Sequence, residues 1–333
     1  MHIKDLRCAV VGHGSWATAI AKVLSGKTEP VRWYVRNPEV IESLQNDGRN
    51  CRYLSDVEFD KNHIRPSSDI NEVVANSDIV FLVTPAAYLK SYLFHLDVSL
   101  KDKIVVSAIK GIIPGEYQTV TEYMHDHYDL SYDQLCFISG PTHAEEVSHN
   151  RLTHITIACQ KEENALIVGR QMENSFLVMN YSTKVNVMEL SAILKNIYAV
   201  ASGFAFGLGY GDNFMAVLVS NSAKEMFNFI GERCELCDVG SMSASILGDL
   251  LVSCYSSHSR NRQLGVLIGR GNTVRTALNE MTMVAEGYFA ADYIRYITMQ
   301  QINQMPIATM VYQVLYKEMP VRKAMKELEN KLQ

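Results

Sequence analysis

A single lysine in a long apolar stretch is the residue of this 333-residue chain that most directly suggests chemistry. Residues 190–211 carry one charged side chain, Lys195, and apolar side chains recur around it at helical spacing. Three interpretations are open: the ammonium group extends to solvent from a buried helix, the stretch spans a membrane, or burial lowers the pKa of the lysine until it exchanges a proton near neutral pH. Asn196, Ser202 and four glycines in the stretch disfavour a membrane span.

A second lysine and a polar turn follow apolar runs that are typical of buried strands. Lys110 comes directly after the run 103–109, and a turn that includes Gly140 and Thr142 comes directly after the run 135–139. Open α/β folds bind ligands at the carboxyl ends of their strands. Lys110 is therefore well placed for an anion or a carbonyl oxygen, and the Thr142 hydroxyl for a substrate or cofactor. An ordinary exposed residue at a strand end is the alternative for Lys110.

Four consecutive residues near position 260 suggest a phosphate site. They are Ser259, Arg260, Asn261 and Arg262, which supply a hydroxyl, two guanidinium groups and an amide. Guanidinium groups match the geometry of phosphate oxygens, and an adjacent amide or hydroxyl satisfies the remaining lone pairs. A solvated basic turn is the alternative interpretation.

A glycine-rich turn near the start of the chain is typical of dinucleotide binding. The apolar run Leu6–Val11 enters Gly12, and the pattern G-x-G-x-x-A continues through Gly14 to Ala17, ahead of a helix predicted over residues 18–25. Gly12 would allow a tight turn, and Gly14 would let backbone amides approach a pyrophosphate. The N-terminus of the helix would then donate to the phosphates. An ordinary tight turn is the alternative.

Arg36, which follows the apolar run Val31–Val35, bears on the choice of nicotinamide cofactor. An NAD-selective site usually carries Asp or Glu roughly 20 residues beyond the glycine turn, where it binds the ribose hydroxyls. Arginine instead accommodates a 2′-phosphate, so the sequence is compatible with NADP. The alternative is a solvated loop arginine, with Glu39 meeting the ribose from the following helix.

The spacing of the histidines and cysteines does not indicate a metal site. His125 and His127 lie in the segment HDHYD, which we expect to be a polar loop. Cys234 and Cys237 form a C-x-x-C pair that no second pair completes, so we expect structural thiols. Seven scattered cysteines are typical of reduced thiols, and residues 1–11 lack the apolar core of a secretory signal. We therefore predict a cytoplasmic protein without a metal cofactor.

The order of the predicted elements indicates two domains. The formal net charge of −5 provides no basic field for nucleic acid, and the length suits domains of about 150 residues each. We predict an α/β fold in which an N-terminal Rossmann-like doubly wound sheet, residues 1–185, precedes a mainly α-helical substrate and catalytic domain, residues 186–333. The predicted strands are 6–11, 31–35, 78–83, 103–109, 135–139, 153–159 and 176–180.

Seven motifs in a fixed order give the chain a family resemblance. They are VVGHGSWATAIA, AIKGI, ISGPTHAEEV, LKNIYAVASG, LGDLLVSC, SRNRQLG and VAEGY. With these motifs the chain resembles NAD(P)-dependent glycerol-3-phosphate dehydrogenase of the bacterial biosynthetic type over nearly its whole length. The resemblance implies NAD(P)H-dependent reduction of dihydroxyacetone phosphate to sn-glycerol 3-phosphate, the backbone of membrane phospholipids.

The resemblance also assigns roles to the residues at matching positions. The implied catalytic residues are Lys195, Lys110 and Asp249, with Lys195 as the acid or base. The implied cofactor contacts, added to Gly12 and Gly14, are Ser15, Trp16, Arg36, Lys110, Ala144, Arg260, Val284 and Glu286. The implied substrate contacts are Lys110, Gly140, Thr142, Lys195, Asp249, Ser259, Arg260 and Asn261. Hydride addition builds negative charge on the carbonyl oxygen, to which protonated Lys195 would donate while Lys110 stabilises it.

The chain departs from the family pattern at three places. Ala17 stands where a third glycine is common, His13 is less typical, and residues 220–226 replace a run that often contains arginine. Two other functions stay open. One is a relative that reduces a keto acid, whose carboxylate would engage Arg260, and the other is a nucleotide-sensing protein without turnover. A homodimer is the default assembly, and we do not expect an integral membrane protein.

Overall fold

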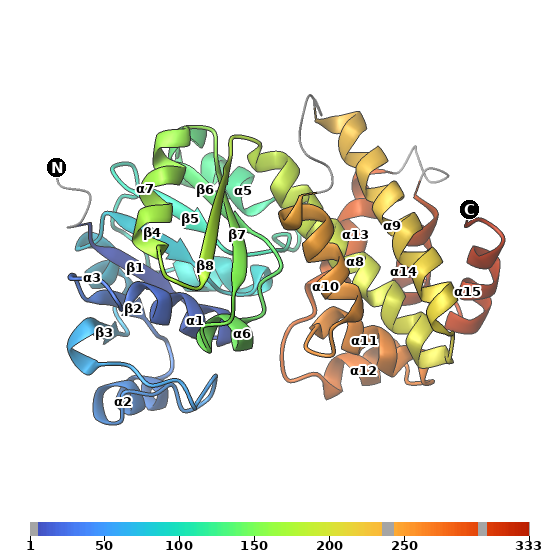
Figure 1. The fold of residues 1–333 in the computed structure, drawn as a ribbon, viewed down its shortest axis with the longest axis horizontal. Helices are drawn as coiled ribbons and strands as arrows, with labels where there is room; N and C mark the ends of the chain where they lie inside the picture. Colours follow the sequence, from blue (N-terminus) through green and yellow to red (C-terminus); the bar gives the residue numbers. More distant parts are fainter. Residues whose placement is uncertain (1–5, 235–242, 299–304, 333) are drawn as a thin grey trace. The chain divides into compact units, whose positions relative to one another are not determined.

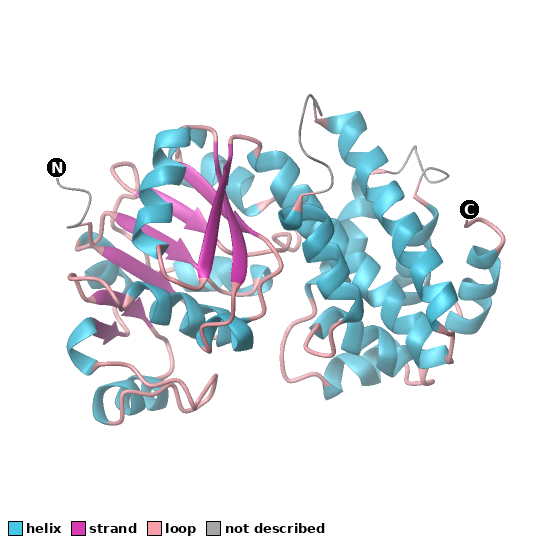
Figure 2. Cartoon of the chain, viewed as in Figure 1, coloured by secondary structure: helices cyan, strands magenta, loops and turns pink. Residues whose placement is uncertain are grey.

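The computed structural model describes residues 6–234, 243–298 and 305–332, which divide into two compact units. The first unit comprises Met1–Ile109 and Gln118–Val185, and the second comprises Lys110–Tyr117 and Asn186–Gln333. The described strands belong to the first unit, whereas the described elements of the second unit are helices (Figure 1, Figure 2). The short segment Lys110–Tyr117 thus groups with the helical unit although it follows a strand of the sheet.

An eight-stranded sheet forms the centre of the first unit. The strands are β1 (Cys8–Val11), β2 (Val31–Tyr34), β3 (Ile64–Ser67), β4 (Ile79–Leu82), β5 (Ile104–Ser107), β6 (Leu135–Ser139), β7 (Thr153–Cys159) and β8 (Leu177–Ser182). Their order in space is β3-β2-β1-β4-β5-β6-β7-β8, and among them β6 and β7 form the antiparallel pair. β1 and β4 are buried apolar runs, as a parallel sheet covered on both faces requires. The predicted doubly wound sheet is therefore confirmed.

Helices connect and cover these strands (Figure 1). They are α1 (Ser15–Leu24), α2 (Pro38–Asn46), α3 (Ile70–Ala75), α4 (Leu89–Leu93), α5 (Val120–Tyr128), α6 (Ala144–Ser148) and α7 (Glu162–Met172). α1 begins at Ser15 rather than at the predicted residue 18. The helix therefore starts immediately after the glycine turn, and its first backbone amides lie next to that turn.

The edge strand β3 was not predicted from the sequence. Its residues Ile64–Ser67 include a proline, and only Ile64 is buried. Proline cannot donate a hydrogen bond to a neighbouring strand and is therefore confined to sheet edges. A short, mostly exposed run with Pro66 lacks the apolar pattern by which the central strands are recognised.

The segment HDHYD is helical, so the expected polar loop at His125 and His127 is wrong. Both histidines lie in α5, whose start is fixed by a capping box between Thr119 and Glu122. Each ring stacks on a tyrosine with the centroids 4.2 Å apart. These histidines therefore pack against aromatic side chains. This helix was not predicted because its sequence is rich in charged residues, and the capping box is its main helix signal.

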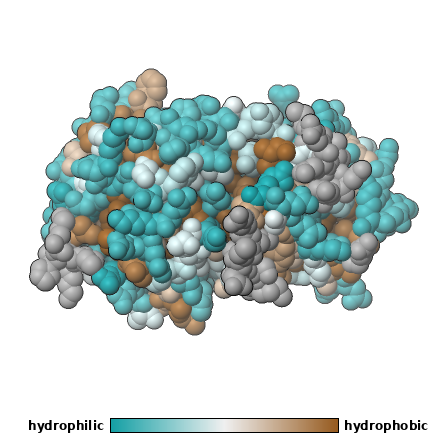
Figure 3. All heavy atoms as spheres, turned by 90° about the horizontal axis from the view of Figure 1, so that it is seen from above, coloured by the Kyte–Doolittle hydropathy of each residue, from teal (hydrophilic) through white to brown (hydrophobic). Residues whose placement is uncertain are grey.

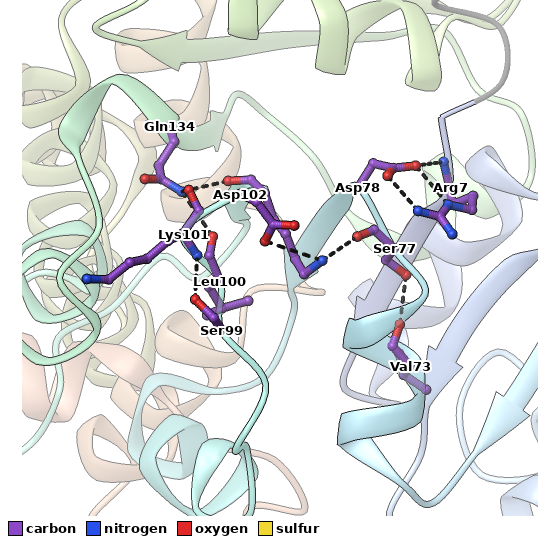
Figure 4. A network of polar contacts seen from close by, with 10 residues as sticks. Arg7, Val73, Ser77, Asp78, Ser99, Leu100, Lys101, Asp102 and Gln134 are labelled. Atoms are coloured by element: carbon purple, nitrogen blue, oxygen red, sulfur yellow. Dashed lines mark hydrogen bonds and ion pairs between the residues drawn. The ribbon is translucent and has the colours of Figure 1, made fainter. Parts of the chain in front are cut away.

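Polar contacts join the amino ends of the central strands (Figure 4). Arg7, just before β1, pairs with Asp78, just before β4, at 2.8 Å. Lys103, which is 7% exposed and precedes β5, donates through Nζ to the carbonyl oxygen of Ser77 at 2.9 Å. Gln134, which precedes β6, donates to the carbonyl oxygen of Lys103 at 2.7 Å. The amino edge of the sheet is thus tied together by side chains, whereas ligands of such folds bind at the opposite, carboxyl edge.

The second unit is built around one long apolar helix. Its helices are α8 (Val185–Leu208), α9 (Asp212–Arg233), α10 (Asp249–Tyr255), α11 (Arg260–Gly269), α12 (Val274–Glu280), α13 (Glu286–Ile297), α14 (Pro306–Tyr316) and α15 (Val321–Glu329), with a π-helical turn at Ala244–Gly248. α8 is long and apolar enough to cross a membrane, but 83% of its most apolar window is buried inside the structure. It is therefore packed as the core helix of a globular unit.

Glycines let α8 and α11 cross with their backbones in contact. A Cβ atom built on Gly203 would lie 2.2 Å from the carbonyl oxygen of Arg262, and one on Gly265 would lie 2.2 Å from that of Val200. One turn further along, Gly207 and Gly269 oppose each other in the same way, with Cβ contacts of 2.6 and 2.8 Å to carbonyl oxygens. Real Cβ atoms do not approach other atoms this closely, so the crossing depends on glycine.

Replacing Gly203 with alanine is expected to lower the free energy of unfolding by about 3 kcal/mol, because two helix backbones must separate. Urea denaturation followed by circular dichroism measures this loss. Gly211→Ala is the matched control, since a Cβ there has no neighbour within 4 Å, and it should cost less than about 1 kcal/mol. Equal losses in the two variants would show that the crossing tolerates a methyl group.

A buried carboxyl group joins α9 to α14. Glu225 lies in the segment 220–226 and is 4% exposed. Its two oxygens accept hydrogen bonds from the backbone amides of Ile307 and Ala308 at 2.8 and 3.0 Å. Burial raises the pKa of Glu225 to about 7, although these amide hydrogen bonds favour the charged form. The segment that departs from the family pattern therefore supplies the cap of α14, whose own N-cap residue offers no side-chain hydrogen bond.

Large apolar side chains are exposed in both units. Phe94 and Leu152 in the first unit are 79% and 72% exposed, and Tyr255 and Tyr296 in the second are 50% and 51% exposed. On the face drawn in Figure 3, hydrophobic residues form small groups within a mainly hydrophilic surface. Apolar side chains exposed in this way are ordinary for globular proteins, and they identify no partner by themselves.

Candidate active site

Two lysines and one aspartate meet inside the second unit. Lys195 lies in α8, Asp249 is the first residue of α10, and Lys110 opens the segment 110–117. Nζ of Lys195 donates to Oδ1 of Asp249, and Nζ of Lys110 donates to Oδ2 of Asp249 at 2.9 Å. The side chains of Lys195 and Asp249 are 9% and 3% exposed. The Lys195 ammonium group is therefore enclosed and does not extend to solvent.

The charges of this cluster act on one another strongly because little water screens them. Burial lowers the pKa of Lys195 to about 8; the negative charge of Asp249 opposes this shift, and the positive charge of Lys110 adds to it. Burial alone would raise the pKa of Asp249, but the two ammonium groups outweigh it and hold that pKa below its usual range. The cluster thus combines an ionised carboxylate with a lysine that can gain or lose a proton near neutral pH.

A chain of side-chain amides holds the backbone around this cluster. Asn196 donates through Nδ2 to the carbonyl oxygen of Lys110 at 2.7 Å, and its Oδ1 accepts from Nδ2 of Asn261 at 2.8 Å. Oδ1 of Asn261 in turn accepts from the backbone amide of Gly287 at 2.8 Å. A Cβ on Gly287 would lie 2.6 Å from the carbonyl oxygen of Asn196, so α13 and α8 touch there. The residue next to Lys195 in the sequence therefore fixes the backbone of the second lysine.

The glycine turn of the first unit has the features that a dinucleotide requires. Gly12 has φ of +125°, and a Cβ there would lie 2.1 Å from the carbonyl oxygen of Val83. Gly14 is the N-cap of α1 and has nothing within 4 Å of its Cβ position. No side chain caps α1, and its first turn, which includes Ser15 and Trp16, holds no acidic residue. Backbone amides at an uncapped, acid-free helix start fit a pyrophosphate.

The end of β2 leads into an arginine at the point where NAD-selective folds usually carry a carboxylate. Arg36 is exposed, and its Nη1 donates to Oγ of Ser91 at 3.1 Å. Its guanidinium carbon lies 3.7 Å from the centre of the Tyr92 ring. Glu39, the other candidate for the ribose, pairs instead with Arg52 at 2.6 Å.

The carboxyl end of β6 carries three further predicted residues. Gly140 has φ of +130°, and a Cβ there would lie 2.6 Å from the carbonyl oxygen of His154. The Thr142 hydroxyl donates to the carbonyl oxygen of Gly140 at 3.2 Å, and Ala144 is the first residue of α6. Gly140, Thr142 and Ala144 therefore form one turn of the first unit.

Comparison with known proteins decides the family. Residues 7–165 match the N-terminal domain and residues 185–326 the C-terminal domain described as NAD-dependent glycerol-3-phosphate dehydrogenase. The glycerol-3-phosphate dehydrogenase [NAD(P)+] of Staphylococcus haemolyticus is 33% identical over 325 residues, which cover 97% of each chain. The chain belongs to the NAD-dependent glycerol-3-phosphate dehydrogenase family. The corresponding protein of Chlorobium phaeobacteroides is also 33% identical, over 97% of each chain.

Solved structures of glycerol-3-phosphate dehydrogenases share the fold of this chain. The structure from Coxiella burnetii superposes with a TM-score of 0.87 at 24% identity and covers 97% of this chain and 98% of that chain. The structure from Plasmodium falciparum superposes with a TM-score of 0.85 at 22% identity, covering 97% and 96%. Family membership confirms the predicted family, the oxidoreductase class, the nicotinamide cofactor and the reaction that interconverts dihydroxyacetone phosphate and glycerol 3-phosphate.

The remaining predicted residues lie at or just before the start of two helices, α11 and α13. Ser259 is the N-cap of α11 and accepts through Oγ from the backbone amide of Arg262 at 3.3 Å, and Arg260 is the first helical residue. Glu286 is the first residue of α13, and Val284 lies two positions before it. The amide chain described above links both helix starts to α8, because Asn261 of α11 binds the amide of the residue after Glu286.

Among the described residues, no group of three or more His, Cys, Asp or Glu side chains is arranged to hold a metal ion. Cys237, one half of the C-x-x-C pair, lies outside the described residues, and Cys234 is half-buried.

Proposed function

We propose that Lys195 exchanges the proton with the C2 oxygen of the substrate when this enzyme interconverts dihydroxyacetone phosphate and sn-glycerol 3-phosphate. The observation that carries the proposal is the enclosed cluster of Lys195, Asp249 and Lys110. A nicotinamide dinucleotide, when bound, would supply or accept the hydride. During reduction, protonated Lys195 donates to the oxygen on which negative charge develops, and during oxidation neutral Lys195 removes the hydroxyl proton.

The two partners of Lys195 have separate roles in this proposal. Lys110 stabilises the developing oxyanion with its positive charge, which acts strongly where water is excluded. Asp249 orients both ammonium groups and keeps Lys195 from losing its proton too early. Asn196 fixes the backbone of Lys110 and so keeps the second charge at one distance from the first.

Other contacts with ligands follow from the helix starts and the strand ends. We assign the substrate phosphate to Arg260, with Ser259 and Asn261 beside it, because a guanidinium fork at a helix N-terminus suits phosphate oxygens. The remaining proposed substrate contacts are Lys110, Gly140, Thr142, Lys195 and Asp249. The proposed cofactor contacts are Gly12, Gly14, Ser15, Trp16, Arg36, Lys110, Ala144, Arg260, Val284 and Glu286.

The setting of the enzyme is part of the same proposal. We assign dinucleotide binding to residues 1–185 and substrate binding and catalysis to residues 186–333, with the segment 110–117 contributing Lys110 to the latter. A cytoplasmic homodimer that supplies phospholipid synthesis, with neither nucleic acid nor a membrane span, fits the acidic net charge and the buried α8. Analytical ultracentrifugation of the purified protein tests the assembly.

The test of the reaction is the loss of nicotinamide absorbance when purified protein is mixed with dihydroxyacetone phosphate and either NADH or NADPH. Turnover that depends on Arg260 and on the phosphate of the substrate would support the proposal. If the protein turns over a keto acid that lacks phosphate but does not turn over dihydroxyacetone phosphate, its substrate is a keto acid. Nucleotide binding without any turnover would indicate a sensing protein.

The two directions of the reaction should depend on pH with opposite signs. Since burial lowers the pKa of Lys195 to about 8, kcat for reduction should fall as the pH rises through about 8, because the proton donor is lost. Over the same range kcat for oxidation should rise, because the neutral base accumulates. Initial rates at saturating substrate, measured in both directions between about pH 6 and pH 10, check this. If kcat changes with pH in the same way in both directions, Lys195 does not transfer the proton.

A further inference from the structure

A connected group of side chains surrounds Arg36 in the first unit, and none of its other members has a role in the reaction so far. Tyr92 of α4 is 5% exposed and presents its ring face to the Arg36 guanidinium, 3.7 Å from ring centre to guanidinium carbon. The Tyr92 hydroxyl lies 2.9 Å from Nδ1 of His13. Ser91, the neighbour of Tyr92, adds a hydrogen bond to Nη1 of Arg36 at 3.1 Å. The exposed arginine is therefore held by two adjacent residues of one helix.

His13 connects this group to the glycine turn. Its ring belongs to the residue between Gly12 and Gly14, and its carbonyl oxygen accepts from Nδ2 of Asn50 at 3.0 Å. Burial, and after it the positive charges of Arg36 and Arg52, lower the pKa of His13, which favours the neutral ring. Nδ1 of a neutral ring shares one hydrogen bond with the Tyr92 hydroxyl in either tautomer. The orientation of Tyr92 is thus set by the same turn that receives the pyrophosphate.

The charges near the ribose position favour a 2′-phosphate over a free hydroxyl. Ribose hydroxyls of NAD are usually bound by a carboxylate at this point of the fold. Here Glu39, the carboxylate that follows Arg36 in the sequence, is paired with Arg52 through both Nε and Nη2, at 3.1 and 2.6 Å. An arginine that is already oriented loses less conformational freedom when it binds a phosphate than one that moves freely.

We propose that Tyr92 is a positioning residue for cofactor specificity: with His13 behind it, it holds the Arg36 guanidinium where it receives the 2′-phosphate of NADPH. The proposal rests on the role assigned to Arg36 above. It implies a preference for NADPH over NADH, and it gives His13, which departs from the family pattern, a part in holding Tyr92. Stacking of guanidinium on a ring leaves its edge available for the phosphate oxygens.

Calorimetric titration of the full-length protein with NADPH and with NADH tests this proposal. The wild-type protein should bind NADPH more tightly. Tyr92→Leu, which removes ring and hydroxyl, should weaken NADPH by about fivefold and leave NADH within about twofold. Tyr92→Phe, which keeps the ring but loses the hydroxyl contact with His13, should lose part of the preference, less than Tyr92→Leu loses. Equal weakening of both cofactors by Tyr92→Leu, or an unchanged ratio, would overturn the proposal, as would a wild-type protein without preference.

A second variant keeps the test decisive if Tyr92→Leu fails to fold. Arg36 is exposed, so Arg36→Lys is expected to fold; it retains the charge but loses the planar stack. Most of the preference for NADPH should disappear in this variant, and its full retention would contradict the role of Tyr92. Because these are binding measurements, they separate the two proposals: a protein that prefers NADPH but does not reduce dihydroxyacetone phosphate refutes the reaction alone.

Discussion

Replacing Lys195 with methionine is expected to lower kcat for the reduction of dihydroxyacetone phosphate by about 10³-fold. Methionine fills a similar volume in the enclosed site, but it cannot donate a proton to the carbonyl oxygen. Lys110 still supplies positive charge, so the residual rate should exceed that of the uncatalysed reaction. The measurement is the initial rate of NAD(P)H oxidation at saturating dihydroxyacetone phosphate, together with NAD(P)H binding by fluorescence, which should be unchanged.

A matched control shows whether the loss of kcat is specific to Lys195 or follows from the replacement of any buried lysine. Lys103 is likewise buried, at 7% exposed, and it binds a backbone carbonyl at the amino edge of the sheet, opposite the edge at which ligands bind. Lys103→Met should lower stability but keep kcat within about threefold of the wild-type value, because no proposed ligand contact involves it. If Lys195→Met retains as much kcat as Lys103→Met, Lys195 is not the acid.

The features that could be predicted from the sequence each lie within one element or two adjacent elements. The glycine pattern at Gly12 and Gly14 follows an apolar strand and precedes a helix, so it identifies the first strand, turn and helix together. Lys195 is the one charge in the apolar stretch 190–211, and a charge in that position must find a partner elsewhere. Because such signals are local, a single sequence is enough to predict these features.

The features that were missed depend on contacts between elements far apart in the chain. Asn196 binds Lys110 and Asn261, which are 86 and 65 positions away, and nothing in the sequence next to Asn196 specifies these partners. The crossing of α8 and α11 gives Gly203 a neighbour only because Gly265 lies opposite it. The pairing of residues across such distances requires the fold itself.

Replacing Asp249 with asparagine is expected to lower the free energy of unfolding by about 3 to 5 kcal/mol at pH 7. Asp249 is 2% exposed, and its two oxygens are the acceptors for both lysines. Without the carboxylate, two positive charges share an enclosed site. The NH₂ group of asparagine is a hydrogen-bond donor, as are the two lysine ammonium groups that it would face. Denaturation in urea measures the loss. Asp78→Asn, which breaks the partly exposed pair with Arg7, is the control and should cost about 1 kcal/mol or less.

The pH dependence of this loss identifies its cause. The pKa of Lys195 in the folded wild-type protein, about 8, lies below the value of about 10.4 for an unfolded chain, so folding releases a proton between these values and stability rises with pH there. Removal of the Asp249 charge lowers the pKa of Lys195 further, and the rise in stability of the variant should begin below pH 8. The difference in stability between wild type and variant should therefore shrink as the pH rises towards about 8 and stay level above that, where Lys195 is neutral in both folded proteins. A difference that stays constant with pH would mean that Asp249 acts through packing and that its charge is not what holds the lysines.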